Sequence, residues 1–460
     1  MINEPDYRIF LSRSLRSFAV NRMMVNHDTC AMTNQTTIAG TAARHASRVV
    51  VVGAGPAGLM AALAAAGARV DVLEAQSQPG RKLLATGGGR CNLCNALDPE
   101  AFMARFGRHG RFLAPALRGL DQTALRRWFA DHGVPTHAAD GFHYFPVAES
   151  ARAVLDALLT AARQAGVRIH PGEPARALLH EDTAAGRRVS GVRTDTGVHP
   201  ATAVVLATGG LGYPALGGSA AGLELARATG HAITPPVPGL APLPVTESWV
   251  AECAGVVLSP GRLWIALPGF PKAGLAGELL FTHHGLSGPA ALDLSATVAR
   301  ALAEHPAGVP LRVALRPDLD AAAWHAHLEQ WRTGDGRKLL PTLLDRLLPA
   351  SLAAVVARLA GVTTTTAARL DRAAHDRLVA LVTALPLTVT RAAGWDRAMV
   401  MAGGIDRREV DPDTLESRRL PGLFFAGELL DVDGPCGGFN LPWAFASGHL
   451  AGQAAAAAHP

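Results

Sequence analysis

The 460-residue chain has few cysteines, few aromatic residues and few charges. Only 5% of its residues are aromatic and 18% are charged, whereas 49% are hydrophobic, which is typical of a globular protein and excludes a disordered one. Five cysteines in a chain of this length do not make a disulfide framework. Because the N-terminal residues also lack the apolar core of a secretory signal, we expect a reducing, cytoplasmic location. The cysteines are Cys30, Cys91, Cys94, Cys253 and Cys436.

The chain also lacks a dense basic block. Its formal net charge is +5, but residues 1–48 hold six arginines against three acidic residues. That segment therefore accounts for +3 of the total and leaves only +2 for the rest of the chain. Binding of nucleic acid requires a concentrated basic surface, often with aromatic side chains that stack on bases. We expect no nucleic-acid partner.

Only one hydrophobic run, residues 49–68, reaches the length of a bilayer-spanning helix. Three glycines and Pro56 lie at its centre, and Arg69 and Asp71 follow it. These residues fit a strand, a turn and a helix better than a membrane span. We therefore expect a soluble protein.

Residues 49–74 carry the pattern of a dinucleotide-binding βαβ unit. The run 49–52 predicts a buried strand, Gly53-x-Gly55-x-x-Gly58 predicts the turn into a helix, and a second strand ends at Glu74. The first glycine makes the tight turn, the second lets the backbone approach a pyrophosphate, and the third lets helix and strand pack closely. The helix N-terminus attracts phosphate, and the acidic residue accepts hydrogen bonds from a ribose hydroxyl. A glycine-rich loop that binds nothing is the alternative, but it does not explain the position of Glu74.

The rest of the chain divides by composition. Helical patterns occupy 99–131 and 150–165, and a small β meander over 167–206 closes with a buried strand at 203–207. Prolines between 235 and 244 indicate a boundary, after which 240–300 is β-rich and 318–385 forms several short helices. We expect a disordered or mis-started tail (1–46), a nucleotide-binding domain in two parts (47–233 and 387–460), and an insertion with a β-rich part (234–317) and a helical part (318–386).

Residues 421–452 predict a second glycine-rich turn between a strand and a helix. A buried strand at 423–426 is followed by Gly437 and Gly438, then by Asn440 as the N-cap of a final helix over 442–458 with Pro442 in its first turn. A helix N-terminus there supports the negative charge that a reduced flavin carries near N1. A nicotinamide cofactor would not need this second turn. FAD would, because its isoalloxazine extends well past the pyrophosphate.

Two long motifs resemble a known family. GRKLLATGGGRCNLCN at 80–95 and GELLDVDGPCGGFN at 427–440 are closely similar to the BaiN-like flavoproteins, also called the aminoacetone-oxidase family of FAD-binding enzymes. Shorter matches at 207–210, 281–295 and 398–428 extend the resemblance over about residues 48–452. It implies an α/β fold, with a Rossmann-like FAD-binding domain of the two-dinucleotide-binding-domain type that is interrupted by an inserted β-barrel-like plus helical domain.

The resemblance also assigns cofactor-binding roles by position. The residues implied for the ADP half are Gly53, Gly55, Ala57, Gly58 and Glu74, with Thr208 and Gly209 closing the nucleotide side. Those implied along the pyrophosphate and flavin are Arg81, Lys82, Thr86, Gly87, Gly88, Gly89, Arg90, Cys91 and Asn92. Those implied for the ribityl chain and the pyrimidine edge are Glu428, Asp431, Gly437, Gly438, Phe439 and Asn440. The family usually has Thr, Tyr and Gln at the positions of Cys94, Phe439 and Pro442, so its substrate preference is not carried over.

Several residues suggest further chemistry. Cys91-x-x-Cys94 is a hypothetical redox dithiol, although its first cysteine belongs to the family's loop and the second replaces a small polar residue. A zinc site that adds His109 and His132 does not have the spacing of a compact finger, so we expect no metal site. His283 is the candidate catalytic proton donor, and a backbone-bonded residue at a domain interface is the alternative.

A second glycine pattern, Gly210-x-Gly212-x-x-Ala215, follows the strand at 203–207. Pro214 interrupts the expected helix start, so no separate NAD(P)H domain is predicted. Reducing equivalents then come from transiently bound NAD(P)H, or from an oxidisable substrate with dioxygen as acceptor.

These patterns together predict an FAD-dependent oxidoreductase that transfers hydride between flavin N5 and a small organic substrate. Reduction of a polarised C=C bond and oxidation of an amine both remain open. The alternative is a non-catalytic flavin-binding redox sensor or partner-binding protein. The sequence does not indicate the oligomeric state.

Overall fold

The structure is a computed structural model that describes residues 47–184 and 186–458. The tail expected at 1–46 lies outside the described residues. No helix among the described residues combines the length and apolar character needed to cross a membrane. The run 49–68 instead forms a strand, a turn and a helix, as its glycines and Pro56 predicted.

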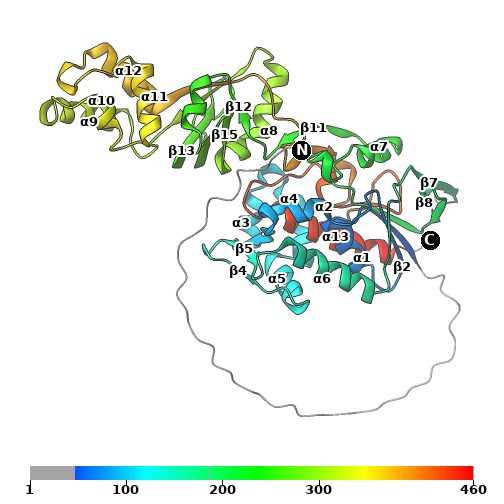
Figure 1. Cartoon of the computed structure of the whole chain (residues 1–460). Helices are drawn as coiled ribbons and strands as arrows, with labels where there is room; N and C mark the ends of the chain where they lie inside the picture. Colours follow the sequence, from blue (N-terminus) through cyan, green and yellow to red (C-terminus); the bar gives the residue numbers. More distant parts are fainter. Residues whose placement is uncertain (1–46, 185, 459–460) are drawn as a thin grey trace, which may run out of the picture. The chain divides into compact units, whose positions relative to one another are not determined.

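A five-stranded parallel sheet forms the centre of the nucleotide-binding part, with the strand order β19-β10-β1-β2-β6 (Figure 1). The three strands β1, β10 and β19 are apolar and buried apart from Arg48, as expected of a parallel sheet covered on both faces, whereas the edge strand β6 is partly exposed. This order brings strands from the start, the middle and the end of the chain side by side. The strands are β1 (Arg48–Val52), β2 (Arg69–Glu74), β6 (Arg168–Pro171), β10 (Ala203–Leu206) and β19 (Leu423–Phe425).

Two helices from opposite ends of the chain, α1 (Pro56–Ala64) and α13 (Asn440–Ala457), pack directly against each other. A Cβ on Gly448 would lie 2.1 Å from the carbonyl oxygen of Ala57, and one on Gly452 would lie 2.1 Å from that of Ala61. The two helix backbones therefore touch because these positions carry no side chain. Figure 1 shows the pair beside the sheet.

Short helices and two small sheets complete this part. The predicted helical stretches at 99–131 and 150–165 are confirmed. Of the β meander predicted over 167–206, only the strands between 177 and 200 form an antiparallel sheet, because the strands at its two ends join the parallel sheet. The helices are α2 (Arg81–Ala85), α3 (Pro99–Ala104), α4 (Gly110–Gly119), α5 (Gln122–Asp131), α6 (Ala151–Gln164) and α7 (Ala221–Ala228). The small sheets comprise β3 (Cys94–Asn95), β4 (Thr136–His137) and β5 (His143–Pro146), and β7 (Ala177–Thr183), β8 (Gly186–Arg193) and β9 (Val198–Pro200).

The insertion is built on a six-stranded antiparallel sheet in the order β12-β15-β14-β13-β16-β17. The backbone N–H of Thr246, just after β12, donates to the carbonyl of Thr388 in β17 at 2.9 Å. This bond joins the two ends of the strand order, so the sheet curls toward a barrel. Its strands are β12 (Leu243–Pro244), β13 (Val257–Ile265), β14 (Leu275–Thr282), β15 (Gly285–Ser287), β16 (Val309–Ala314) and β17 (Leu385–Val389).

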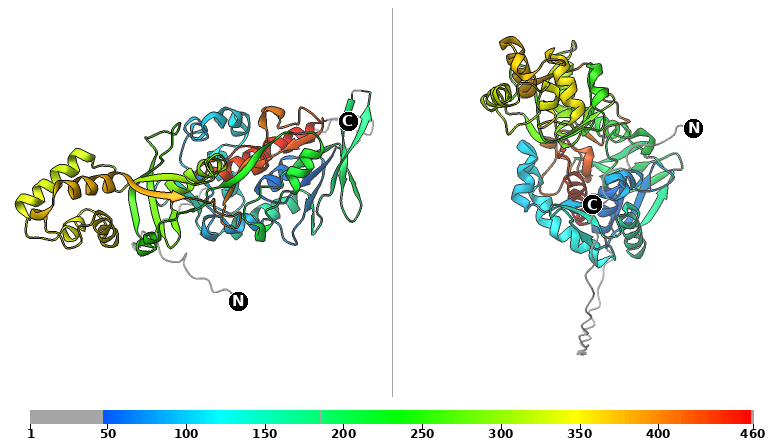
Figure 2. Two further views of the ribbon diagram at one scale, coloured as in Figure 1. Left: turned by 90° about the horizontal axis from the view of Figure 1, so that it is seen from above. Right: turned by 60° about the vertical axis from the view of Figure 1, so that its left-hand side comes forward.

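The helices of the insertion follow the sequence prediction with one correction. The segment 240–300 is not uniformly β-rich, because α8 (Pro289–Glu304) begins at a proline that favours a helix start and continues with Ala and Leu. Beyond β16, the predicted short helices are α9 (Ala321–Gly334), α10 (Leu340–Leu344), α11 (Ala350–Ala360) and α12 (Arg372–Ala384). In both views of Figure 2 these four helices gather next to the six-stranded sheet, and α12 contacts β16 and β17.

Two strands, β11 (Ile233–Gly239) and β18 (Val400–Ile405), pair antiparallel where the chain enters and leaves the insertion. The two sheets have separate hydrophobic cores, one from residues 49–226 and 401–455 and one from residues 243–389. The α/β fold with a parallel Rossmann-type sheet and an additional region is thus confirmed. For the domain boundaries we propose one change: β17 ends at Val389, so the insertion extends past 386.

Candidate functional site

The turn between β1 and α1 has the shape that a dinucleotide needs. Gly53 has φ +104°, and a Cβ there would lie 2.4 Å from the carbonyl oxygen of Ala207. A Cβ on Gly58 would lie 1.8 Å from the carbonyl oxygen of Gly53. A side chain at position 58 would therefore prevent α1 from packing this closely against the turn that precedes it. Around Gly55, in contrast, nothing lies within 4 Å of the Cβ position. The turn is packed on the protein side at Gly53 and Gly58 and open at Gly55, where a pyrophosphate would approach.

The carboxylate of Glu74 lies at this turn. Its Oε2 accepts a 2.8 Å hydrogen bond from the backbone N–H of Ala54, and its Oε1 accepts one of 2.8 Å from Gln76. A carboxylate has acceptor capacity for about four hydrogen bonds, so each oxygen can take one more. The position and the free capacity fit a ribose hydroxyl.

The loop after α2 bends sharply at its glycines. Gly87, Gly88 and Gly89 have φ of +58°, +66° and +87°, a conformation that glycine adopts without a Cβ penalty. The buried Cys91 shares this conformation at φ +62°, which is strained for a residue with a side chain. Strained residues of this kind are concentrated at ligand-binding loops.

The C-terminal glycine turn meets this loop. Nδ2 of Asn95 donates to the carbonyl oxygens of Gly437 and Gly438 at 3.1 and 3.2 Å. Oδ1 of Asn92 is buried without a hydrogen-bond partner and would lie 3.0 Å from a Cβ on Gly438. A buried acceptor without a donor is costly, and it fits a loop that a polar ligand completes. The structure thus brings the first and last motifs together.

Glu428 joins four segments of the chain. Its Oε2 pairs with Nζ of Lys82 at 2.9 Å and accepts from the backbone N–H of Gly210 at 3.1 Å. Its Oε1 accepts from the backbone N–H of Met401 at 2.8 Å. Two residues expected to contact the cofactor separately, Lys82 and Glu428, therefore form a half-buried ion pair.

The start of α13 corrects the role expected for Asn440. The helix begins at Asn440 itself, and Phe439 is the N-cap residue without a side-chain cap. The Asn440 amide instead braces the preceding loop, where Oδ1 accepts from the N–H of Gly434 and Nδ2 donates to its carbonyl, both at 2.9 Å. The amide is engaged in the loop and cannot cap the helix. The N–H groups at this end of α13 therefore lack a side-chain acceptor, as a helix-terminal anion site requires.

Several other expected cofactor residues contact protein. Arg81 donates to Oε1 of Gln76 at 2.8 Å and to the carbonyl of Ala215 at 2.9 Å. The guanidinium of Arg90 lies 4.8 Å from the ring centre of Phe145. The ring of Phe439 is buried against Phe102 and Phe106, with centroid distances of 5.1 and 6.1 Å, and thus belongs to an aromatic cluster.

Two further expected residues face the protein interior. The buried Oγ1 of Thr208 has no hydrogen-bond partner and lies against α7, 1.9 Å from the Cβ position of Gly222. Asp431 is buried, and its Oδ2 accepts a 3.0 Å bond from Thr234 Oγ1 at the entry to the insertion. The structure thus places Asp431 at the β11–β18 crossing.

The Cys91-x-x-Cys94 pair is reduced and buried. Burial raises the pKa of each thiol to about 12. Dithiol exchange requires a thiolate, so this environment opposes the redox hypothesis. The zinc hypothesis finds no support among the described residues either, where His109 bonds to the Asp431 carbonyl at 3.0 Å and His132 stacks on Trp128.

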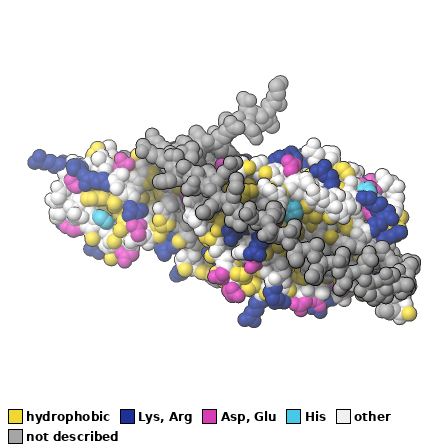
Figure 3. All heavy atoms as spheres, turned by 90° about the horizontal axis from the view of Figure 1, so that it is seen from below, with side chains coloured by type: hydrophobic (Ala, Val, Ile, Leu, Met, Phe, Trp, Pro, Cys, Tyr) yellow, Lys and Arg dark blue, Asp and Glu magenta, His cyan; other side chains and the backbone are white. Residues whose placement is uncertain are grey.

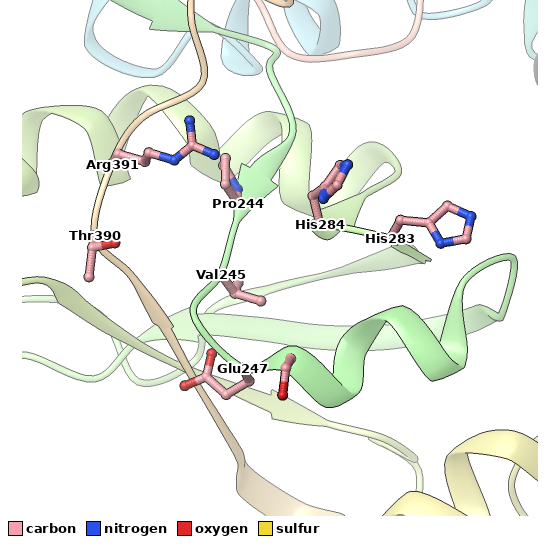
Figure 4. Close-up of a pocket in the computed structure, with 8 residues that line it drawn as sticks. Pro244, Val245, Glu247, His283, His284, Thr390 and Arg391 are labelled. Carbon is pink, nitrogen blue, oxygen red and sulfur yellow. The ribbon is translucent and has the colours of Figure 1, made fainter.

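His283 lies on the exposed turn between β14 and β15. It borders a cavity of about 150 Å³. The lining residues, which include Glu247, His284 and Arg391, all come from the insertion and the two residues that follow β17. Figure 4 shows the imidazole of His283 pointing away from Arg391. None of the contacts described for residues 47–184 and 186–458 joins His283 to the cofactor loops, and its role as proton donor stays a prediction.

Two residues that the sequence patterns did not single out lie beside the C-terminal glycine turn, at Cys436 and Gly437. Asp293 of α8 accepts a 2.7 Å bond at Oδ1 from the backbone N–H of Cys436, and burial raises the pKa of this carboxyl. Nε2 of His143 would lie 3.0 Å from a Cβ on Gly437, while its Nδ1 is 2.6 Å from Oδ2 of Asp140. Asp293 lies in the stretch 281–295, which resembles the family, and this resemblance was the only feature of the sequence that could have indicated the residue.

Comparisons with known proteins agree with this geometry. The family described as HI0933-like protein Rossmann domain matches residues 47–454. A 3-dehydro-bile acid delta(4,6)-reductase from Clostridium scindens is 34% identical over 433 residues, which cover 89% of this chain and 99% of the relative. Ribosomal RNA dihydrouridine synthases from Escherichia coli and Haemophilus influenzae are 29% and 26% identical, and each alignment covers 88% of this chain and 96% or 97% of the relative.

These matches span nearly all of the described residues and confirm the family resemblance that the two glycine-rich motifs implied. The chain belongs to the HI0933-like family of Rossmann-domain flavoproteins and is an oxidoreductase.

Proposed function

We propose that this oxidoreductase binds FAD and reduces a carbon–carbon double bond conjugated to a carbonyl group in a small organic molecule. One observation carries the proposal: the loop at 86–92 and the turn at 437–440 meet through Asn92, Asn95 and Gly438. A nicotinamide site would use only the first glycine turn, whereas FAD extends from the first turn to the second. When bound, FAD supplies the atom that accepts and donates hydride.

The chain's own residues bind and orient that cofactor. The open backbone at Gly55 and the N-terminus of α1 receive the pyrophosphate, and Glu74 accepts from the ribose. The ion pair of Lys82 and Glu428 lies between the two glycine turns in the proposed site and joins the segments that carry them. The N-terminus of α13, free of a side-chain cap, supports negative charge at the pyrimidine edge.

The named relatives favour reduction over amine oxidation. One is named as a delta(4,6)-reductase and two as dihydrouridine synthases, whose product is a uridine with its ring double bond saturated. Both names describe reduction of a double bond next to a carbonyl. Such a reaction adds a hydride to one carbon and a proton to its neighbour, so it needs a proton donor beside the flavin.

We propose Asp293 as the donor of that proton and His143, which lies beside Gly437, as the alternative. Asp293 belongs to α8 of the insertion and contacts Cys436, which directly precedes the C-terminal glycine turn. Burial raises the pKa of its carboxyl, which therefore stays protonated to higher pH than in water. A donor on the insertion side is consistent with a substrate that lies between the flavin and the insertion. His283 remains the third candidate and lies at an exposed turn.

The size of the substrate is the second question, because RNA is named for two of the relatives. On the described part of the face in Figure 3, Lys and Arg side chains lie apart and alternate with Asp and Glu. On the part of this face that is described, the charged side chains thus form no continuous basic surface of the kind that binds a phosphate backbone. We therefore propose a small-molecule substrate in the cytoplasm and transiently bound NAD(P)H as electron donor, and uridine in RNA is the alternative.

A stopped-flow experiment tests the proposal. The flavoprotein is mixed with NADH, NADPH or a panel of amines, and bleaching of the flavin is recorded. The reduced protein is then mixed with a steroid 4,6-dien-3-one or with a uridine-containing RNA, and reoxidation under anaerobic conditions is followed. We expect bleaching by a nicotinamide and reoxidation by the steroid. Reduction by amines alone would indicate an oxidase, reduction by dithionite alone a redox sensor, and reoxidation only by RNA the alternative substrate.

A further inference from the structure

A cluster of two histidines and one aspartate lies on the helical part of the insertion, in a region to which the proposed function gives no role. His325 comes from α9, and His375 and Asp376 come from α12. One possible ligand atom from each residue lies within 4.8 Å of the other two. Among the described residues this is the only group of His, Cys, Asp or Glu with such spacing.

The distances suit a small divalent cation. Nδ1 of His375 is 3.6 Å from Oδ1 of Asp376. Two ligands bound tetrahedrally at about 2.1 Å from zinc are roughly 3.4 Å apart, so this pair needs almost no movement. The His325 ring lies with its centroid 4.8 Å from that of His375. His325 is exposed, and its ligand nitrogen lies within 4.8 Å of those of the other two residues.

The surrounding charges are mixed. Glu329, one turn after His325 on α9, interacts electrostatically with His375, but its carboxylate is bonded to Arg332. Nε of Arg372 lies 4.0 Å from Oδ2 of Asp376. The two carboxylates attract a cation and the two arginines oppose it, so binding depends mainly on the two imidazoles as direct ligands.

We propose that His325, His375 and Asp376 form a binding site for a divalent cation of the zinc class, with water or Glu329 as the fourth ligand. Two imidazoles and one carboxylate are typical ligands of Zn²⁺, Ni²⁺ and Cu²⁺, whereas Mg²⁺ and Ca²⁺ prefer oxygen alone. The bound ion joins α9 to α12, which are about 50 residues apart in sequence and pack against each other. This site departs from the expectation that the chain has no metal site.

The test uses the full-length flavoprotein without a histidine tag, freed of metal with a chelator. Titration calorimetry with ZnCl₂ measures the affinity and the number of sites. We expect one site that depends on these residues, with a Kd in the micromolar range, and His325→Ala and Asp376→Asn should each weaken it at least tenfold. His305→Ala replaces an exposed histidine at the end of α8 and serves as the matched control, with unchanged affinity.

A second measurement separates binding at the site from loose association. Zinc that binds only the folded protein raises its melting temperature, so one equivalent should raise it in the parent protein and in His305→Ala but not in His325→Ala. A Kd in the millimolar range, or equal losses in His305→Ala and His325→Ala, would overturn the proposal. Flavin content should stay the same in all variants, because the site shares no described contact with the cofactor loops.

Discussion

The nucleotide-binding part and the insertion differ in how their residues are constrained. In the first, glycines are required because backbone atoms occupy the space of a side chain, as at Gly53, Gly58, Gly448 and Gly452. The insertion also has such glycines, at Gly274 and Gly285, but its sheet and helices share a core of Leu, Val and Ala, where many apolar residues of similar volume would serve. The comparison shows that the glycine turns of the nucleotide-binding part are recognisable by motif, whereas a functional site in the insertion must be found from the structure.

The largest effect is expected in the glycine turn. Gly53→Ala should destabilise the protein by about 3–5 kcal/mol or prevent folding, because its methyl group would meet the Ala207 carbonyl at 2.4 Å. The control is Gly67→Ala, whose φ of +109° is close to the +104° of Gly53 but whose surroundings are empty. That change should cost only the backbone strain, about 1–2 kcal/mol. Urea denaturation measures the free energy of unfolding of both variants. Equal losses of stability would show that backbone strain, and not the contact with the Ala207 carbonyl, causes the destabilisation.

The insertion should tolerate damage without loss of the cofactor. Leu311 is fully buried in β16, and Leu311→Ala should cost about 2–5 kcal/mol through the cavity that it leaves. Because the two cores are separate, we expect increased hydrogen exchange in 243–389 and unchanged flavin content. Flavin loss in parallel with the unfolding of the insertion would show that the two regions fold as one unit.

A substitution at Glu428 tests how much its contacts with three other segments of the chain contribute to stability and FAD binding. Glu428→Gln removes the charge that pairs with Lys82 and replaces one acceptor oxygen by an amide donor that faces backbone N–H groups. We expect a loss of about 1–3 kcal/mol in stability and roughly tenfold weaker FAD binding. Fluorescence titration of the apoprotein with FAD measures the affinity. Lys82→Met is the comparison, and it should have the smaller effect because the N–H donors of Gly210 and Met401 still pair with Glu428.

A substitution at Asp293 tests the contact between the insertion, which carries this residue, and Cys436 in the nucleotide-binding part. Because burial raises the folded-state pKa above the ordinary value of 3.8, the folded protein holds the proton more tightly than the unfolded chain. The contribution of Asp293 to stability is therefore greatest at acidic pH and falls as the pH rises from 3.8 through the folded-state pKa. Asp293→Asn keeps an acceptor for Cys436 but does not titrate.

The stability of the parent protein relative to Asp293→Asn should thus decline with rising pH, which urea denaturation at several pH values measures. A difference that rises with pH would contradict the assignment. If Asp293 supplies the proton, Asp293→Asn should also lower turnover at least tenfold and leave the reduction of the flavin by NAD(P)H unchanged.

The smallest effect is expected at His283. His283→Gln changes an exposed side chain at the β14–β15 turn, so flavin content and turnover should remain within about twofold of the parent protein. Steady-state kinetics at saturating substrate provides the measurement. A large fall in turnover with normal flavin content would restore His283 as the proton donor and move the substrate site into the insertion.

The sequence predicted the parallel sheet, the two glycine turns, the β meander and the short helices of the insertion. It failed in detail at the start of the last helix and within the insertion. Asn440 was expected to cap the helix that it begins, but its amide bonds to Gly434 instead. The segment 240–300 was expected to be β-rich, and beside four strands it contains the start of the helix α8.

The sequence alone indicated the nucleotide-binding fold, because the turn into α1 and the loop at 87–89 need a positive φ at closely spaced positions, and glycine supplies it. Tertiary structure alone decided the partners of Glu428, the contact of Asp293 with Cys436 and the approach of His325 to His375. These side chains meet because strands and helices distant in sequence pack together. Their proximity depends on the register and crossing of those elements, which no local pattern of residues specifies.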